Sequence, residues 1–174
     1  MKSRLLNVIL VVSDTLRRDH LPIYADTDVR APNLTAFAQQ ALVFDNCYPS
    51  SFPTVPARAD LMTGRYTFTY LPWGPLPQNE VTLARTLAQA GYATAAIADT
   101  PFVARNGYGF DRGFLDFIYV RGQLHGTERD YRQMHRGVSE AEGYCAAKTF
   151  QEAVGWLEQH HKRPFFLCRH LGPP

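Results

Sequence analysis

Short aliphatic runs alternate with amphipathic patterns along most of the chain. The first run covers residues 6–12 and is almost continuous, which is typical of a strand buried on both faces in a parallel sheet. Further strands are predicted at 42–47, 93–98 and 165–170. Helices are predicted at 33–41, 55–63, 82–90 and 139–160. This alternation indicates an α/β fold, a doubly wound and mostly parallel sheet with helices on both faces.

The pattern weakens in the second half of the chain. Residues 101–138 are rich in Gly, Arg and aromatic residues and show no clear period, so we expect an irregular insertion over one edge of the sheet. The last helix has apolar residues at steps of four, four and three, which predicts a buried face made of Ala146, Phe150, Val154 and Leu157. No domain boundary is indicated within residues 1–174.

Composition narrows the function classes. The 174 residues are 45% hydrophobic, as in globular domains, and the net charge is +2 without a basic stripe, so no nucleic-acid partner is expected. The first apolar run is shorter than the roughly 20 residues of a membrane span and lacks a cleavage site. Three cysteines without short spacing argue against a disulfide framework or a zinc site, and a cytoplasmic location is expected.

A threonine and an arginine in the segment 52–65 suit attack on an anionic group. With Pro56 in the first turn of a helix, Thr54 falls at the N-cap, among free backbone N–H groups at the positive end of the helix dipole. Arg58 follows one turn later and can reach the same anion with two donors. The layout suits a phosphate or sulfate ester. Thr-x-Pro is also an ordinary helix start, so a structural role stays open.

Polar residues also end three of the predicted strands. Asp14 follows the first one, and ligand sites in open α/β sheets gather at the carboxyl ends of strands. A carboxylate there can bind a hard divalent cation, although capping of the next turn is the alternative. At the same edge, the candidate substrate-binding residues are Asp99, Thr100 and His170.

Several motifs, in order, resemble the sulfatase-like branch of the alkaline phosphatase superfamily. Residues 7–17 resemble its first strand with the Asp-Thr-Leu-Arg ending, and residues 32–38 resemble its Pro-Asn-Leu helix. Residues 54–65 match its Cys/Ser-x-Pro-x-Arg signature, followed by Thr-Gly-Arg, at every fixed position but the first. Further likenesses lie at 82–94, 109–114 and 121–123.

The resemblance implies a metal-dependent hydrolase acting on a small-molecule anionic ester. Thr54 would be the nucleophile and would share a divalent metal with Asp14, while Arg58 would stabilise the transferred group. True sulfatases convert a cysteine or serine at this position to formylglycine, which is not expected for Thr54. An unmodified threonine favours phosphodiester or phosphonate ester substrates. Ca²⁺ would accompany sulfatase-type chemistry, and Zn²⁺ or Mn²⁺ the phosphate type.

The chain also departs from the family's pattern. Thr15 follows Asp14 where many members have a second acidic residue, and residues 98–101 lack the family's Gly-Lys-x-His segment. Residues 163–170 resemble the late strand, but the Asp-Pro-His segment does not follow. We therefore expect the N-terminal part of a longer hydrolase, shortened by truncation, frameshift or trimming, and inactive without its C-terminal half. The alternative is a non-catalytic remnant with an incomplete metal site.

Overall fold

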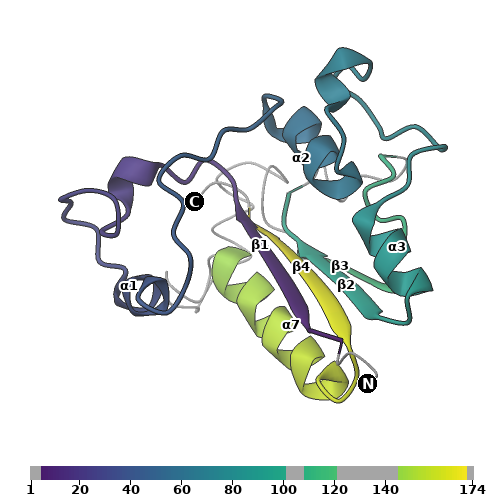
Figure 1. Cartoon of the computed structure of the whole chain (residues 1–174). Helices are drawn as coiled ribbons and strands as arrows, with labels where there is room; N and C mark the ends of the chain where they lie inside the picture. Colours follow the sequence, from purple (N-terminus) through teal and green to yellow (C-terminus); the bar gives the residue numbers. More distant parts are fainter. Residues whose placement is uncertain (1–4, 101–107, 121–144, 172–174) are drawn as a thin grey trace, which may run out of the picture.

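Four parallel strands form the centre of the fold, in the order β1-β4-β2-β3 (Figure 1). The computed structural model describes residues 5–100, 108–120 and 145–171. The strands are β1 (Val8–Ser13), β2 (Ala93–Ala98), β3 (Asp116–Tyr119) and β4 (Phe165–Leu171). Although β4 is last in the chain, it lies between β1 and β2, as expected for a sheet built from crossover connections. The predicted α/β class is confirmed.

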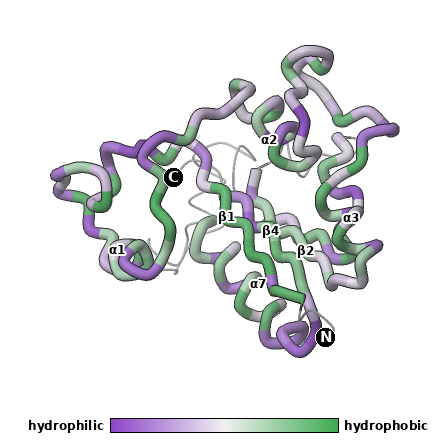
Figure 2. The backbone as a smooth tube through the Cα atoms, in the orientation of Figure 1, coloured by the Kyte–Doolittle hydropathy of each residue, from purple (hydrophilic) through white to green (hydrophobic). Residues whose placement is uncertain are grey.

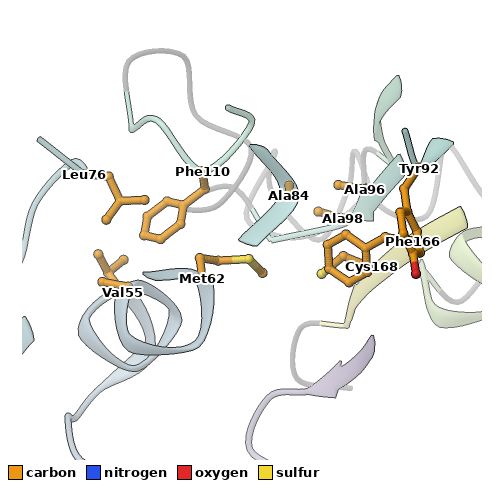
Figure 3. Packing of buried hydrophobic residues seen from close by; sticks show 11 residues of the cluster. Val55, Met62, Leu76, Ala84, Tyr92, Ala96, Ala98, Phe110, Phe166 and Cys168 are labelled. Carbon is orange, nitrogen blue, oxygen red and sulfur yellow. The ribbon is translucent and has the colours of Figure 1, made fainter. Parts of the chain in front are cut away.

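Helices cover both faces of the two central strands. On one face lie α2 (Thr54–Thr63) and α3 (Leu83–Gln89), and on the other lies α7 (Cys145–His160) (Figure 1). Side chains alternate along a strand, so β2 and β4 each contribute to two separate cores. Figure 3 shows the core under α2 and α3, which includes Val55, Met62, Ala84, Ala96, Phe110, Phe166 and Cys168. The core under α7 includes Ala95, Ile97, Ala153, Trp156, Phe165 and Leu167.

The buried face of α7 differs from the predicted one. Its buried residues are Thr149, Ala153 and Trp156, whereas Phe150 and Val154 are exposed. Trp156 decides the orientation, because its indole packs edge-on against Phe165 and its Nε1–H donates to Asp116 Oδ2 at 2.7 Å. An indole with a buried apolar body and a satisfied donor stabilises this face more than the aliphatic spacing alone.

Strand β1 is exposed, which contradicts the prediction of burial on both faces. Among the described strands it pairs only with β4, and the side chains of Ile9 and Val11 are each 53% exposed. Figure 2 shows the strand as a hydrophobic stretch at the margin of the sheet. None of the described helices packs over β1 as α7 and α3 pack over β2. The apolar side chains of β1 therefore lack the burial that its sequence predicts.

The segment between β1 and α2 holds the other differences. Two short elements lie there, the 3-10 helix η1 (Arg18–His20) and α1 (Pro32–Ala38), and α1 ends earlier than the predicted 33–41. The predicted strand 42–47 is wrong, since these residues are irregular and exposed. A strand needs a neighbour to pair with, and 42–47 pairs with none of the described strands.

Strand β3 lies inside the stretch predicted to be irregular. It has only four residues, and its pairing with β2 stabilises it more than any local pattern could. Residues 101–107 and 121–138 of that stretch lie outside the described residues, as do residues 139–144 of the predicted last helix. After α2 comes a second 3-10 helix, η2 (Thr67–Thr69). No described helix is long and apolar enough to cross a membrane.

Candidate functional site

Asp14 lies at the carboxyl edge of the sheet, as the sequence predicts. Its backbone N–H donates to the carbonyl of Leu171 at 2.9 Å, which extends the pairing of β1 with β4 by one residue. The next residue, Thr15, has φ of 57°, a left-handed conformation that is unusual for a residue other than glycine. The chain therefore turns sharply after Asp14, whose side chain is mostly buried.

Thr54 is the first residue of α2, not its N-cap. The N-cap is Pro53, and no side chain caps the helix, so the predicted capping role of Thr54 is wrong. Instead, the hydroxyl of Thr54 donates to Asp14 Oδ2 at 3.2 Å. The carboxylate is a charged acceptor, which makes this a strong hydrogen bond. Thr54 still lies in the first turn, where the helix dipole favours negative charge.

Arg58 lies one turn further along α2 and faces the same carboxylate. Its side chain is nearly enclosed, at 9% exposure, and its Nη2 is 3.4 Å from Asp14 Oδ2. Burial lowers the pKa of Arg58 below its ordinary value, while the charge of Asp14 acts in the opposite direction. A guanidinium has so high a pKa that it keeps its proton here. Asp14 therefore receives a hydroxyl and a cation on one oxygen.

Behind Arg58 lies a second polar group. The Nε–H of Arg58 donates to Nε2 of His170, which is near the end of β4. The Nδ1 of the same ring is 2.9 Å from the hydroxyl of Thr100, and that hydroxyl donates to Asp99 Oδ1 at 3.3 Å. Asp99, Thr100 and His170 are only 2–4% exposed. Their contact with a substrate stays a prediction. Hydrogen bonds join them to one another and, through His170, to Arg58.

The surroundings of His170 keep its ring neutral. Burial and the positive charge of Arg58 lower the pKa of His170 to about 4, and Asp14 offsets this only in part. Mostly apolar side chains line the space next to Arg58 and His170, including Met62, Phe110 and Phe117. Burial also raises the pKa of the Cys168 thiol to about 12, so it stays protonated. Cys168 is buried and takes part in no disulfide.

Six predicted residues thus meet as two joined groups at one edge of the sheet. The first contains Asp14, Thr54 and Arg58, and the second contains Asp99, Thr100 and His170, with Arg58 bonded to both. The first group can polarise a hydroxyl and attract an anion. The sequence did not predict the link between Arg58 and His170, because no local pattern relates two residues 112 positions apart.

The metal-binding capacity of the described residues is limited. Asp14 and Thr54 offer adjacent oxygen donors of the kind that hard divalent cations bind. No group of three or more His, Cys, Asp or Glu side chains that could hold a metal ion is found in the described part of the chain. These two oxygens fit part of a metal site, since a hard cation takes about six oxygen ligands.

Comparison with known proteins adds the family context. The Sulfatase family model matches residues 6–173. An arylsulfatase of Hemicentrotus pulcherrimus is 26% identical over 196 residues, a match that covers 92% of this chain and 36% of the relative. An N-acetylglucosamine-6-O-sulfatase of Bacteroides thetaiotaomicron is 26% identical over 174 residues, covering 97% of this chain and 30% of the relative. The chain spans about a third of the length of these curated relatives.

Solved structures share the same fold. The phosphonate monoester hydrolase of Agrobacterium radiobacter superposes with a TM-score of 0.74 at 21% sequence identity. The match covers 98% of this chain and 41% of that protein. The arrangement of β1, β2, β4 and their helices is therefore part of a known, larger α/β architecture.

Proposed function

Because the chain belongs to the sulfatase family, we propose that the full-length protein is a metal-dependent hydrolase of phosphate-type or sulfate esters with Thr54 as its nucleophile. The proposal depends on one observation, the convergence of Thr54 Oγ1 and Arg58 Nη2 on Asp14 Oδ2 at 3.2 and 3.4 Å. A hydroxyl, a carboxylate and a fixed cation at a helix N-terminus are the groups that attack on an anionic ester needs.

The proposed reaction has two displacements. In the first, Oγ1 of Thr54 forms a bond to the phosphorus or sulfur atom, and the bond to the leaving alcohol oxygen breaks with its electron pair. The proton of the hydroxyl passes to its acceptor, Asp14 Oδ2, which leaves a lone pair of Oγ1 for the substrate, and the leaving alkoxide takes a proton from water. Arg58 and the N-terminal N–H groups of α2 stabilise the charge on the transferred oxyanion. Water then hydrolyses the ester on Thr54 and restores the free hydroxyl.

Members of this family typically use a divalent metal ion. We assign Asp14 and Thr54 as two of its oxygen ligands, with the remaining ligands outside the described residues. When bound, the metal supplies charge neutralisation and lowers the pKa of a hydroxyl that coordinates it. Ca²⁺ suits a sulfate ester, and Zn²⁺ or Mn²⁺ a phosphate-type ester.

An unmodified threonine favours phosphate-type over sulfate substrates. Thr54 carries a methyl group on the carbon that formylglycine formation would oxidise to an aldehyde, so no formylglycine is expected at this position. The name of the structural relative, a phosphonate monoester hydrolase, supports phosphonate or phosphate diesters as the substrate class. A cytoplasmic location also stays a prediction.

The test compares two variants of Thr54 in the full-length protein. Thr54→Ala removes the nucleophile and is expected to lower turnover of the best nitrophenyl ester by roughly three to four orders of magnitude. Thr54→Ser keeps a hydroxyl and is expected to retain turnover within about tenfold. The substrates are a phosphate monoester, a phosphodiester, a phosphonate and a sulfate. Wild-type turnover by Thr54→Ala would contradict the assignment of the nucleophile.

A non-catalytic role is the second candidate. The absence of a group of three metal-ligating side chains from the described residues favours it. Calorimetric titration of the 174-residue chain with Ca²⁺, Mn²⁺ and Zn²⁺ tests whether this chain by itself holds a metal site. Binding weaker than about 1 mM is expected of one carboxylate and one hydroxyl. Binding far tighter than this would show that the chain alone completes a metal site.

A further inference from the structure

A buried chain of hydrogen bonds ends at the guanidinium of Arg58. It begins at Asp99 and Thr100, which follow β2, and crosses to His170 near the end of the adjacent strand β4. From there it reaches Arg58 on α2, so three elements of the fold meet in it. Every member is buried, and a buried polar network orders side chains when all its groups are paired.

The direction of each hydrogen bond follows from the chemistry of its members. A guanidinium can only donate, so Nε2 of His170 accepts from Arg58 and carries no proton. The neutral ring then holds its proton on Nδ1 and donates to Oγ1 of Thr100 at 2.9 Å. The hydroxyl of Thr100 is left to donate to Asp99 Oδ1 at 3.3 Å. Thr100 thereby selects the tautomer of His170 that Arg58 requires.

We propose that Thr100 and His170, anchored by Asp99, are positioning residues that direct Arg58 toward Asp14, Thr54 and the oxyanion of a bound substrate. This inference depends on the proposed function, because Arg58 is there the group that binds the transferred oxyanion. Arginine has a long, flexible side chain and loses rotamer entropy when it is fixed. Because His170 already holds Nε in the free protein, the Arg58 side chain loses less conformational entropy when the substrate binds.

The uncharged ring explains why a histidine suits this position. A carboxylate in its place would hold Arg58 equally well, but its negative charge would compete with the oxyanion for the guanidinium. The pKa of His170 is lowered to about 4, so near pH 7 the ring accepts the hydrogen bond without adding charge. Arg58 therefore keeps its positive charge for Asp14 and the substrate, in surroundings where screening by water is weak.

A matched pair of variants at Thr100 tests the proposal in the full-length protein. Thr100→Val keeps the shape but removes the hydroxyl, so Nδ1–H loses its acceptor and the ring can turn a proton toward Arg58. Thr100→Ser keeps the hydroxyl. Calorimetry with inorganic phosphate and with inorganic sulfate should show about tenfold weaker binding for Thr100→Val, and a change of less than about twofold for Thr100→Ser. Equal affinities for the two variants would overturn the proposal.

A second measurement does not depend on how the variants fold. Long-range ¹H–¹⁵N NMR of the His170 ring distinguishes its tautomers, and the wild type is expected to carry the proton on Nδ1. A proton on Nε2 in the wild type would overturn the proposal. A purely structural role would lower the free energy of unfolding of Thr100→Val without weakening anion binding, and that result would also overturn it.

The control that separates this inference from the proposed function is Thr54→Ala. This variant should lose turnover but keep the NMR signature of His170. Wild-type turnover by Thr54→Ala would contradict the nucleophile and leave the role of Thr100 standing. Unchanged anion binding by Thr100→Val, beside an inactive Thr54→Ala, would contradict the positioning role alone.

Discussion

Strands β1 and β4 are neighbours with similarly apolar sequences, yet their surroundings differ. Residues 165–168 of β4 are buried beneath helices on both faces, whereas Val8, Ile9 and Val11 of β1 are exposed. An apolar run therefore indicates that a strand should be buried. It does not show whether other segments of this chain bury it. Among the described residues, β4 has helices over both faces and β1 does not.

The candidate site lies on the boundary between these two regions. Arg58, Thr100 and His170 belong to the buried region and hold one another in place. Asp14 comes from the exposed strand and reaches Thr54 and Arg58 from the other side. Arg58, proposed to bind the anion, is thus fixed by packing, and Asp14, one of the two proposed metal ligands, is supplied by the less covered region.

The largest contrast is expected between core substitutions in the two strands. Phe166→Ala removes a fully buried ring from β4 and should lower the free energy of unfolding by about 3–5 kcal/mol. Val11→Ala in β1 should cost less than about 1 kcal/mol in the 174-residue chain, because the side chain is half exposed. Denaturant titration measures both. A loss above about 2 kcal/mol for Val11→Ala would show that β1 is covered in solution.

The buried region should also respond to pH through His170. Its pKa is near 6.5 in the unfolded chain and about 4 in the folded one, so the unfolded state binds more protons between these values. The free energy of unfolding should therefore fall as the pH drops from 6.5 to 4, by up to about 3 kcal/mol. His170→Asn should remove this contribution. The same slope in the wild type and in His170→Asn would contradict the burial of a neutral ring.

A smaller effect is expected where α7 meets the sheet. Trp156→Phe loses the hydrogen bond to Asp116 and some packing volume, which should cost about 2 kcal/mol. Val154→Ala, on the exposed side of the same helix, should cost less than about 1 kcal/mol. The comparison by thermal or denaturant unfolding tests which face of α7 is buried. If Val154→Ala lowered the free energy of unfolding more than Trp156→Phe, the buried face of α7 would be the one predicted from the spacing.

The sequence predicted the elements whose patterns are local. The strand at 93–98 and the helix beginning near Thr54 lie where the hydrophobic pattern and the Thr-x-Pro motif put them. The predicted strand at 42–47 was wrong and β3 was missed, because strand formation depends on a partner that the local sequence does not name. The buried face of α7 was wrong because a single tryptophan outweighed the aliphatic spacing.

The residues of the candidate site were predicted, but the hydrogen bonds that join them were not. Asp14 and Thr54 were expected at one edge of the sheet, and the structure brings them within hydrogen-bond distance. The N-cap assignment of Thr54 was wrong because α2 begins at Thr54 itself, with Pro53 as the N-cap, and the hydroxyl donates to a carboxylate from another element. The contact of Arg58 with His170 requires α2 to pack beside β4, and this packing cannot be read from either segment alone.

The most direct test of the account is to identify the residue that carries the transferred group. The full-length protein is quenched during turnover of its best nitrophenyl ester, and its peptides are analysed by mass spectrometry. We predict one phosphoryl, phosphonyl or sulfuryl group on the side chain of Thr54, and none at that position in Thr54→Ala. The group on another residue, with Thr54 unmodified, would contradict the account.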